Sequence, residues 1–247
     1  MALIVKPLPA TTYFVNHSSF AGDDDWVHRD EPTLQFRSAI SNPVLRFDLG
    51  SAQAVDTMAV VYSSNHSAGE LRVKYGINEL PESATYTVPL STRTGCKVAI
   101  IPIPSGSYRY FQIFFDGTTE NAIIDRFIAG KALPFTELGG TAIGAEQAFI
   151  DQSIIYSGAG WESHDEYDVL TQWKVSLDFI EGDDFRAEFA PFMRSVGRHK
   201  AFLFAPQTYD PSRWPDEAIF GRIRSDAAAM NSAGDLRKME LTIRSLS

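Results

Sequence analysis

An acidic tripeptide followed by tryptophan is the segment with the clearest capacity for binding chemistry. Asp23, Asp24 and Asp25 supply carboxylate oxygens, which calcium prefers as ligands. The indole of Trp26 can stack on the apolar face of a sugar ring while the carboxylates accept hydrogen bonds from its hydroxyl groups. The alternative is a solvated acidic turn with Trp26 capping a core beneath it. This simpler interpretation stays open beside the first.

A second group of acids lies between residues 160 and 170. Glycoside hydrolysis requires two carboxyl groups at a defined separation, and spacing along a loop does not set that separation. The acids concerned are Glu162, Asp165, Glu166 and Asp168. We interpret them as a solvated acidic loop.

Histidine and cysteine show no pattern typical of a metal site. The histidines, which are His17, His28, His66, His164 and His199, lack the H-x-x-x-H spacing, and Cys96 has no second thiol. The sequence also lacks a G-x-S-x-G elbow, a Walker loop and a G-x-G-x-x-G motif. We therefore predict that the protein is not an enzyme and has no metal or cofactor, calcium at Asp23–Asp25 excepted.

Composition narrows the class of partner. The chain has 247 residues, of which 44% are hydrophobic and 21% are charged, with a net charge of −9. Such a charge disfavours recognition of nucleic acid, and the apolar runs are too short to span a membrane. The first residues also lack a signal peptide's basic region and apolar core. We expect a protein that is made and kept in the cytoplasm.

The first half of the chain predicts a β-sandwich over residues 1–135. Short segments rich in β-branched and aromatic residues are bounded by Gly, Pro, Asn, Asp or Ser, without helical stretches between them. These segments cover 44–49, 57–62, 70–75, 97–103 and 108–115. In the third, Leu71, Val73 and Tyr75 alternate with Arg72 and Lys74, which predicts one buried and one wet face.

The second half predicts a smaller, β-rich α+β domain over residues 136–247. A proline and paired glycines at 133–141 mark the boundary. Strands are expected at 148–156, 167–180, 201–204, 219–224 and 238–243. Between them, helical spacing from Phe185 to Val196 predicts a helix that begins at Asp183 or Asp184, ends at Gly197 and is kinked or divided by Pro191.

The N-terminal half resembles the galactose-binding, discoidin-like jelly roll of carbohydrate-binding modules. The resemblance covers roughly residues 10–132. It depends on an acidic loop at 21–26, the strand end Leu45-Arg46-Phe47-Asp48-Leu49-Gly50, and the late strand that begins Tyr108-Arg109-Tyr110 and is followed by 124–130. It implies a jelly-roll sandwich in which Asp23–Trp26 form the acidic loop before the strands, the segment considered above for a glycan or calcium.

The C-terminal half resembles tail-tip proteins of long-tailed bacteriophages, whose ring-forming fold is shared with tail tubes. The matching segments are 173–180, 196–206, 220–223 and 241–246. The resemblance implies a structural subunit of the distal tail or baseplate, located in the virion. Its partners would be copies of itself in a ring, tail tube protein, tape measure and baseplate hub. The alternative is a carbohydrate-binding module that attaches the virion to host surface glycans.

Charge and aromatic residues suggest how such a ring would form. Residues 160–190 contain nine acids and two bases, whereas 191–247 contain nine bases and six acids. Opposite poles on one domain favour a head-to-tail contact, although pairing within the chain would also account for them. We predict Trp214, Phe220 and Arg222 as self-assembly interface residues.

Overall fold

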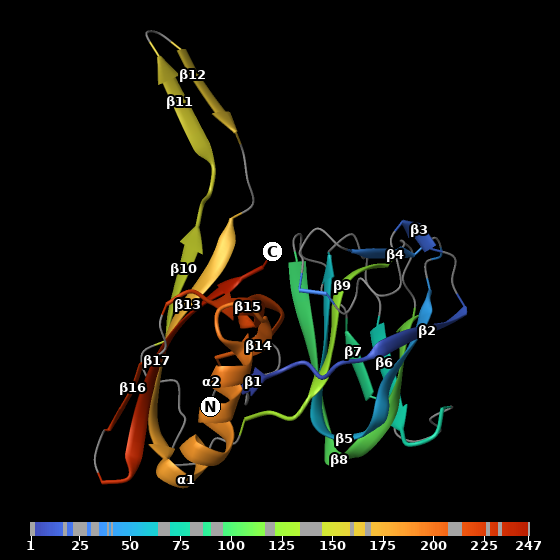
Figure 1. The fold of residues 1–247 in the computed structure, drawn as a ribbon. Coiled ribbons are helices and arrows are strands. Elements are labelled where there is room, and N and C mark those ends of the chain that lie inside the picture. Colours follow the sequence, from blue (N-terminus) through green and yellow to red (C-terminus); the bar gives the residue numbers. More distant parts are fainter. Residues whose placement is uncertain are drawn as a thin grey trace. The chain divides into compact units, whose positions relative to one another are not determined.

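In the computed structural model, the described residues form two compact units (Figure 1). The sandwich unit comprises Ala2–Leu133 and Phe202–Phe220, and the arm unit comprises Pro134–Ala201 and Gly221–Ser247. The predicted domains, 1–135 and 136–247, differ from this division in the placement of Phe202–Phe220. The structure describes residues 3–16, 19–21, 29–30, 35–38, 40, 42–63, 70–79, 86–89, 96–116, 122–133, 145–158, 161–165, 169–206, 214–225, 228–231 and 234–246.

Two long strands, β5 (Val44–Ser63) and β8 (Cys96–Asp116), form both layers of the sandwich unit. The first half of β5 and the second half of β8 share a layer with β2 (Thr11–Asn16), β6 (Glu70–Gly76) and β7 (Tyr86–Pro89). The other halves share a layer with β9 (Ile123–Gly130), β4 (Phe36–Ser38) and β3 (Ser19–Ala21). The fold class predicted from the sequence is confirmed: the chain is mainly β, with a jelly-roll sandwich.

The sequence predicted separate strands where the structure has these two long ones. Segments 44–49 and 57–62 both lie in β5, and 97–103 and 108–115 both lie in β8. Register shifts between Asp48 and Gln53, and between Val55 and Thr57, divide the pairing without ending the strands. Gly50, whose φ is +78°, allows β5 to bend at the first of these register shifts.

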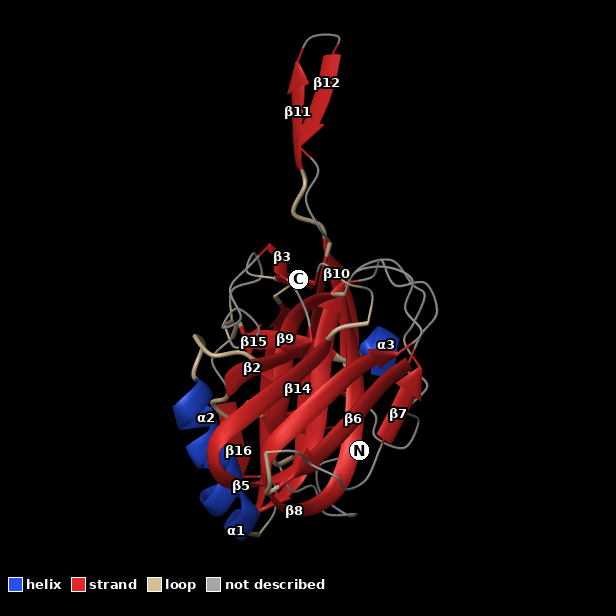
Figure 2. Cartoon of the chain, turned by 90° about the vertical axis from the view of Figure 1, so that its right-hand side faces the viewer, coloured by secondary structure: helices blue, strands red, loops and turns tan. Residues whose placement is uncertain are grey.

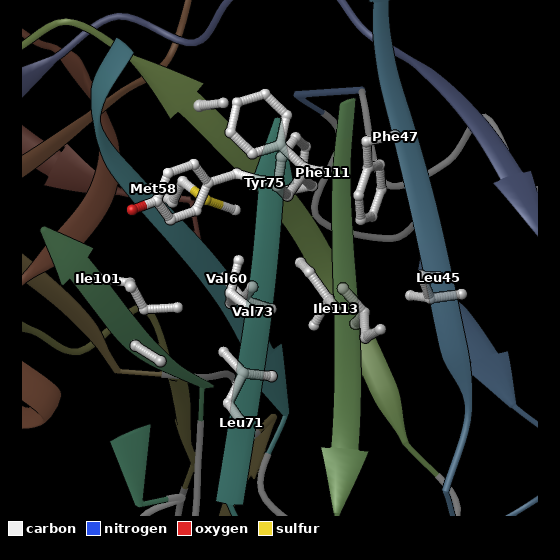
Figure 3. Packing of buried hydrophobic residues seen from close by; sticks show 14 of the residues in the cluster. Leu45, Phe47, Met58, Val60, Leu71, Val73, Tyr75, Ile101, Phe111 and Ile113 are labelled. Carbon is white, nitrogen blue, oxygen red and sulfur yellow. The ribbon is translucent and has the colours of Figure 1, made fainter. Parts of the chain in front are cut away.

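Apolar side chains from both layers meet in one core (Figure 3). The Phe47 ring in the first layer stacks on Phe127 of the second, with 3.8 Å between ring centroids. Leu71, Val73 and Tyr75 point into this core, so the alternation predicted for 70–75 is confirmed. Burial of each such side chain contributes about 1.5–3 kcal/mol.

The second layer is also buried on its outer face. Outward-facing residues there have almost no solvent exposure, and they are Ala59, Val61, Val98, Ile100 and Ile128. On this face, Arg126 lies over the ring of Phe220. Helix α3 (Trp214–Glu217) lies against β8, and β14 (Phe202–Ala205) pairs with β1 (Leu3–Val5). The segment Phe202–Phe220 thus belongs to the packing of this unit.

In the arm unit, β13 (Leu170–Glu181) pairs with β17 (Leu236–Ser245). The other edge of β13 pairs with β10 (Glu146–Ile150), while β15 (Ile219–Ile223) and β16 (Ala228–Asn231) pair with β17. The alternation of Trp173, Val175, Leu177 and Phe179 with polar residues predicts that these four point inward. The first three are buried, whereas Phe179 is 43% exposed, because the strand has a register shift between Leu177 and Ile180 and Phe179 has φ +64°. The tail-tube-like character predicted for this unit stays a prediction.

The predicted helix consists of consecutive segments, as Pro191 led us to expect. These are α1 (Gly182–Asp184), the π-helical η2 (Phe185–Phe189) and α2 (Ala190–Val196). Just before Pro191, the Ala190 N–H donates to the Phe185 carbonyl, the wider spacing of a π-helix. Glu181 is the N-cap, so the predicted start at Asp183 or Asp184 is wrong, whereas the predicted end at Gly197 is confirmed by its φ of +53°.

Candidate functional site

The predicted glycan or calcium loop, Asp23, Asp24, Asp25 and Trp26, lies outside the described residues. Its described C-terminal flank includes Asp30, whose Oδ1 lies 3.0 Å from Nη2 of Arg126 on β9. Burial lowers the pKa of Arg126 to about 10, and the charge of Asp30 opposes this shift. The flank of the loop is therefore held to the sheet by an ion pair with a largely buried cation.

The predicted self-assembly residues lie mostly inside the protein. Trp214 and Phe220 are only 6% and 7% exposed, and both belong to the sandwich unit. Arg222 is half-buried on β15, opposite Arg244 of β17. The predicted contact between copies stays a prediction, but these two aromatic residues are core residues and do not present a free apolar surface. Sequence alone did not distinguish an interface aromatic from a core aromatic.

The Asp48-Leu49-Gly50 motif is a structural ion-pair site. Arg109 binds Asp48 with both Nε and Nη2, at 2.7 and 2.8 Å, and the Gly50 N–H donates to Oδ1 at 2.7 Å. The hydrogen bond from Arg109 holds the pKa of Asp48 below its usual value, and the Gly50 N–H adds to this effect against the cost of burial. Leu49 is buried. This motif fastens the bend of β5 to β8.

The second group of acids does not form a described catalytic pair. Asp165 lies on β12 (Trp161–Asp165), exposed, where it accepts a 3.1 Å hydrogen bond from the Tyr156 hydroxyl. Glu162 lies on the same strand, opposite Ser157, while Glu166 and Asp168 lie outside the described residues. The structure thus places the first two acids on a strand where the sequence indicated a loop.

A projecting hairpin is the most unusual surface of the molecule. Strands β11 (Ile154–Gly158) and β12 pair only with each other and stand beyond the other strands of the arm unit (Figure 2). We call residues 149–169 the hairpin arm. Its described apolar residues include five that are strongly exposed, namely Phe149, Ile154, Ile155, Tyr156 and Val169.

Strand β11 exposes apolar side chains on both of its faces. Successive residues of a strand point to opposite faces, and Ile154, Ile155 and Tyr156 are all exposed. An isolated two-stranded ribbon is at best marginally stable in water. The predicted single strand at 148–156 is wrong, because the structure divides it between β10 and β11. The glycine-rich turn Ser157-Gly158-Ala159-Gly160 was the available signal.

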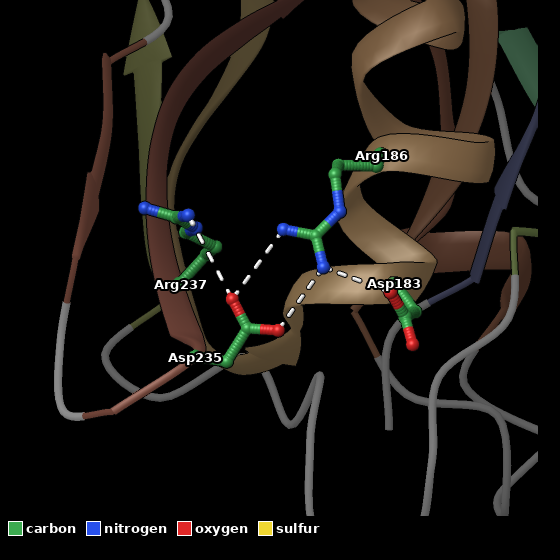
Figure 4. A network of polar contacts seen from close by, with 4 residues as sticks. All are labelled: Asp183, Arg186, Asp235 and Arg237. Carbon is green, nitrogen blue, oxygen red and sulfur yellow. Dashed lines mark hydrogen bonds and ion pairs between the residues drawn. The ribbon is translucent and has the colours of Figure 1, made fainter.

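An ion-pair network fastens the start of the helical segment (Figure 4). Arg186 Nη2 lies 2.8 Å from Asp183 and 3.1 Å from Asp235, and Arg237 lies 3.8 Å from Asp235. The Asp235 carboxylate lies so close to Gly182 that a side chain at that glycine would collide with it. Because Arg186, Asp183 and Asp235 are well exposed, water and salt screen these ion pairs, and they contribute little to the stability of the fold.

Within the part of the chain that the structure describes, no group of three or more His, Cys, Asp or Glu residues is arranged to hold a metal ion. None of the described helices has the length and apolar character needed to cross a membrane.

Comparisons with known proteins give matches among solved structures, and three of these each cover about half of this chain. No protein-family model matches the sequence, and no curated protein sequence matches it. Among solved structures, one match is CBM32-1 from a family 31 glycoside hydrolase of Clostridium perfringens, with 15% identity, 51% of this chain and 96% of that chain covered, and a TM-score of 0.42. Another is the CBM32 of AlyQ in complex with 4,5-unsaturated mannuronic acid, with 16% identity, 47% and 95% coverage, and a TM-score of 0.35.

A third match is the chitosan-binding module 1 from a chitosanase/glucanase of Paenibacillus sp. IK-5. It has 14% identity, covers 50% of this chain and 94% of that chain, and has a TM-score of 0.37. The structural neighbours are thus carbohydrate-binding modules.

Proposed function

We propose that the protein is a non-catalytic structural subunit that assembles with copies of itself in the tail tip of a long-tailed bacteriophage. The observation that supports this role most strongly is the hairpin arm, with apolar side chains exposed on both faces. Contiguous apolar surface of this kind is typical of a site that another protein covers. The arm thus replaces Trp214 and Phe220 as the leading contact between copies.

We place the subunit in a phage tail tip because the C-terminal half of the sequence resembles tail-tip proteins. In that setting the subunit is made in the host cytoplasm and incorporated into the virion. Tail tube protein, tape measure and baseplate hub are its proposed neighbours, and the sandwich unit is carried at the periphery. A contact between two different surfaces of identical subunits closes into a ring when the rotation between neighbours permits.

Self-association of concentrated full-length chain, followed by mass photometry and sedimentation, tests this role. We expect oligomers, and we expect Ile155→Asp to shift them to monomer because a charge then occupies the arm's apolar face. Ile77→Asp is the matched control, since Ile77 and Ile155 are both 66% exposed and Ile77 lies in the sandwich unit.

A reconstruction of the tail tip provides the decisive measurement. We expect this chain in a symmetric ring. A tail tip that lacks the chain, or in which its copies do not touch one another, would overturn the proposal.

The alternative function is attachment to host surface glycans through the sandwich unit. It is favoured by the jelly-roll fold of this unit together with the sequence resemblance over residues 10–132.

Binding of the full-length chain to a glycan array, with and without calcium, tests this alternative. We expect binding to be lost in Trp26→Ala and kept in Trp161→Ala, a control in the hairpin arm. Absence of binding across a broad array, under both conditions, would contradict it.

A further inference from the structure

The hairpin arm lies in a segment of the chain that contains acidic residues but no lysine or arginine. Residues 132–173 contain seven acids and no lysine or arginine. Two of these acids, Asp151 and Asp165, are described on the arm and are exposed. The arm is therefore both apolar and acidic, and a surface that covers it should be basic.

The arm unit itself carries such a surface at the end of its helical segment. Residues 189–209 contain no acid, and they include Arg194 on α2 and Arg198 and Lys200 in the turn after it. All three are exposed. We call Arg194, Arg198, His199 and Lys200 the basic turn. Cations at the C-terminus of a helix are also favoured by the helix dipole.

The arm and the basic turn of one molecule do not meet. Figures 1 and 2 both show β11 and β12 extending away from the helical segment of their own unit. A second copy of the chain carries the same basic turn, with the same three exposed cations. Charge complementarity between two separate surfaces of one unit thus identifies the occupant as another copy.

We propose that the hairpin arm of one copy lies on the basic turn of the next. This inference depends on the proposed self-assembly and adds the two surfaces that make the contact. Apolar burial of Ile155 and Tyr156 would supply most of the affinity, and the charges would set register and association rate. Because arm and turn are different surfaces, the contact is head-to-tail.

Cross-linking between two differently tagged copies tests this arrangement. In a Cys96→Ser background, one copy carries Ile155→Cys and the other His199→Cys, which preserves the three cations of the turn. A short bis-maleimide should join them into a heterodimer. The same mixture with Ile77→Cys in place of Ile155→Cys is the control and should give no such product.

Charge reversal provides the second measurement. Lys200→Glu on the receiving copy should lower the cross-linked yield about tenfold, which corresponds to about 1.4 kcal/mol, and Asp165→Lys on the arm copy should restore part of it. Unchanged yield in Lys200→Glu would overturn the docking site.

The outcomes separate this inference from the proposed function. Oligomers that form without a link between positions 155 and 199 would overturn the docking site and leave self-assembly intact. A 155–199 link in a protein that the tail tip lacks would support the docking site and overturn the virion role.

Discussion

The sandwich core and the hairpin arm use the same kind of residue in the same kind of strand, yet only the core is covered. Phe47 on β5 is 1% exposed, whereas Phe149 at the base of the arm is 68% exposed. The difference is a second layer: Phe47 faces Phe127 across the sandwich, whereas Phe149 lies on β10, the edge strand beside β13 from which the hairpin extends. Burial is thus decided by what lies opposite a strand.

The apolar residues of the sandwich and those of the hairpin arm have different roles. Those of the sandwich stabilise the fold of the chain, because removing them leaves a cavity in a close-packed interior. Those of the arm contribute little to that fold and remain available for an external partner. Substitutions in the two regions should therefore affect different measurements.

The largest expected effect is that of Phe47→Ala. It removes a buried ring and its stack on Phe127, so the free energy of unfolding should fall by about 3–5 kcal/mol. Urea denaturation checks this value. Phe149→Ala is the matched control and should change it by less than about 0.5 kcal/mol. Equal losses would show that the arm is part of the core.

Asp48→Asn should have the next largest effect. The amide cannot form the charged pair with Arg109, so stability at pH 7 should fall by about 1–3 kcal/mol. The pKa of Asp48 is lower in the folded protein than its usual value. Its contribution is therefore complete above the unfolded pKa of about 3.9 and is lost as the pH falls through the folded pKa.

Urea denaturation of the wild type and of Asp48→Asn at several pH values tests whether the contribution of Asp48 is lost in acid. The gap in stability between them should be constant from pH 7 to about 5 and should narrow below about pH 4. A gap that widens in acid would contradict the assignment of Asp48 as a stabilising carboxylate.

A moderate effect is expected for Gly50→Val. Gly50 has φ +78° and open space around it, so the cost is backbone strain rather than collision, about 1–2 kcal/mol. The melting temperature should fall accordingly. Gly50→Asn should cost less, since asparagine tolerates this conformation. If both variants melted like wild type, the bend would not require glycine.

The smallest effect is expected for Tyr156→Phe in the hairpin arm. It removes the exposed hydrogen bond to Asp165, which should change the free energy of unfolding by less than about 0.5 kcal/mol. Thermal melting of dilute monomer is the measurement. A clear loss of stability would indicate that the arm folds cooperatively with its unit.

The sequence alone determined the features that depend on local pattern. Alternation predicted the buried faces of 70–75 and of β13 around Trp173, because successive side chains of a strand point to opposite sides. Gly197 predicted the helix end. The mainly β fold class follows from the same signals.

Only the tertiary structure decided which apolar surfaces are covered. Trp214 and Phe220 were predicted to anchor an interface because they are large aromatic residues, but both are buried in the sandwich unit, which contains Phe202–Phe220 although these residues are remote in sequence. Residue type and periodicity also could not show that Ile155 and Tyr156 lie on a two-stranded ribbon. A pattern of side chains fixes which residues share a face, and long-range packing fixes whether anything lies against that face.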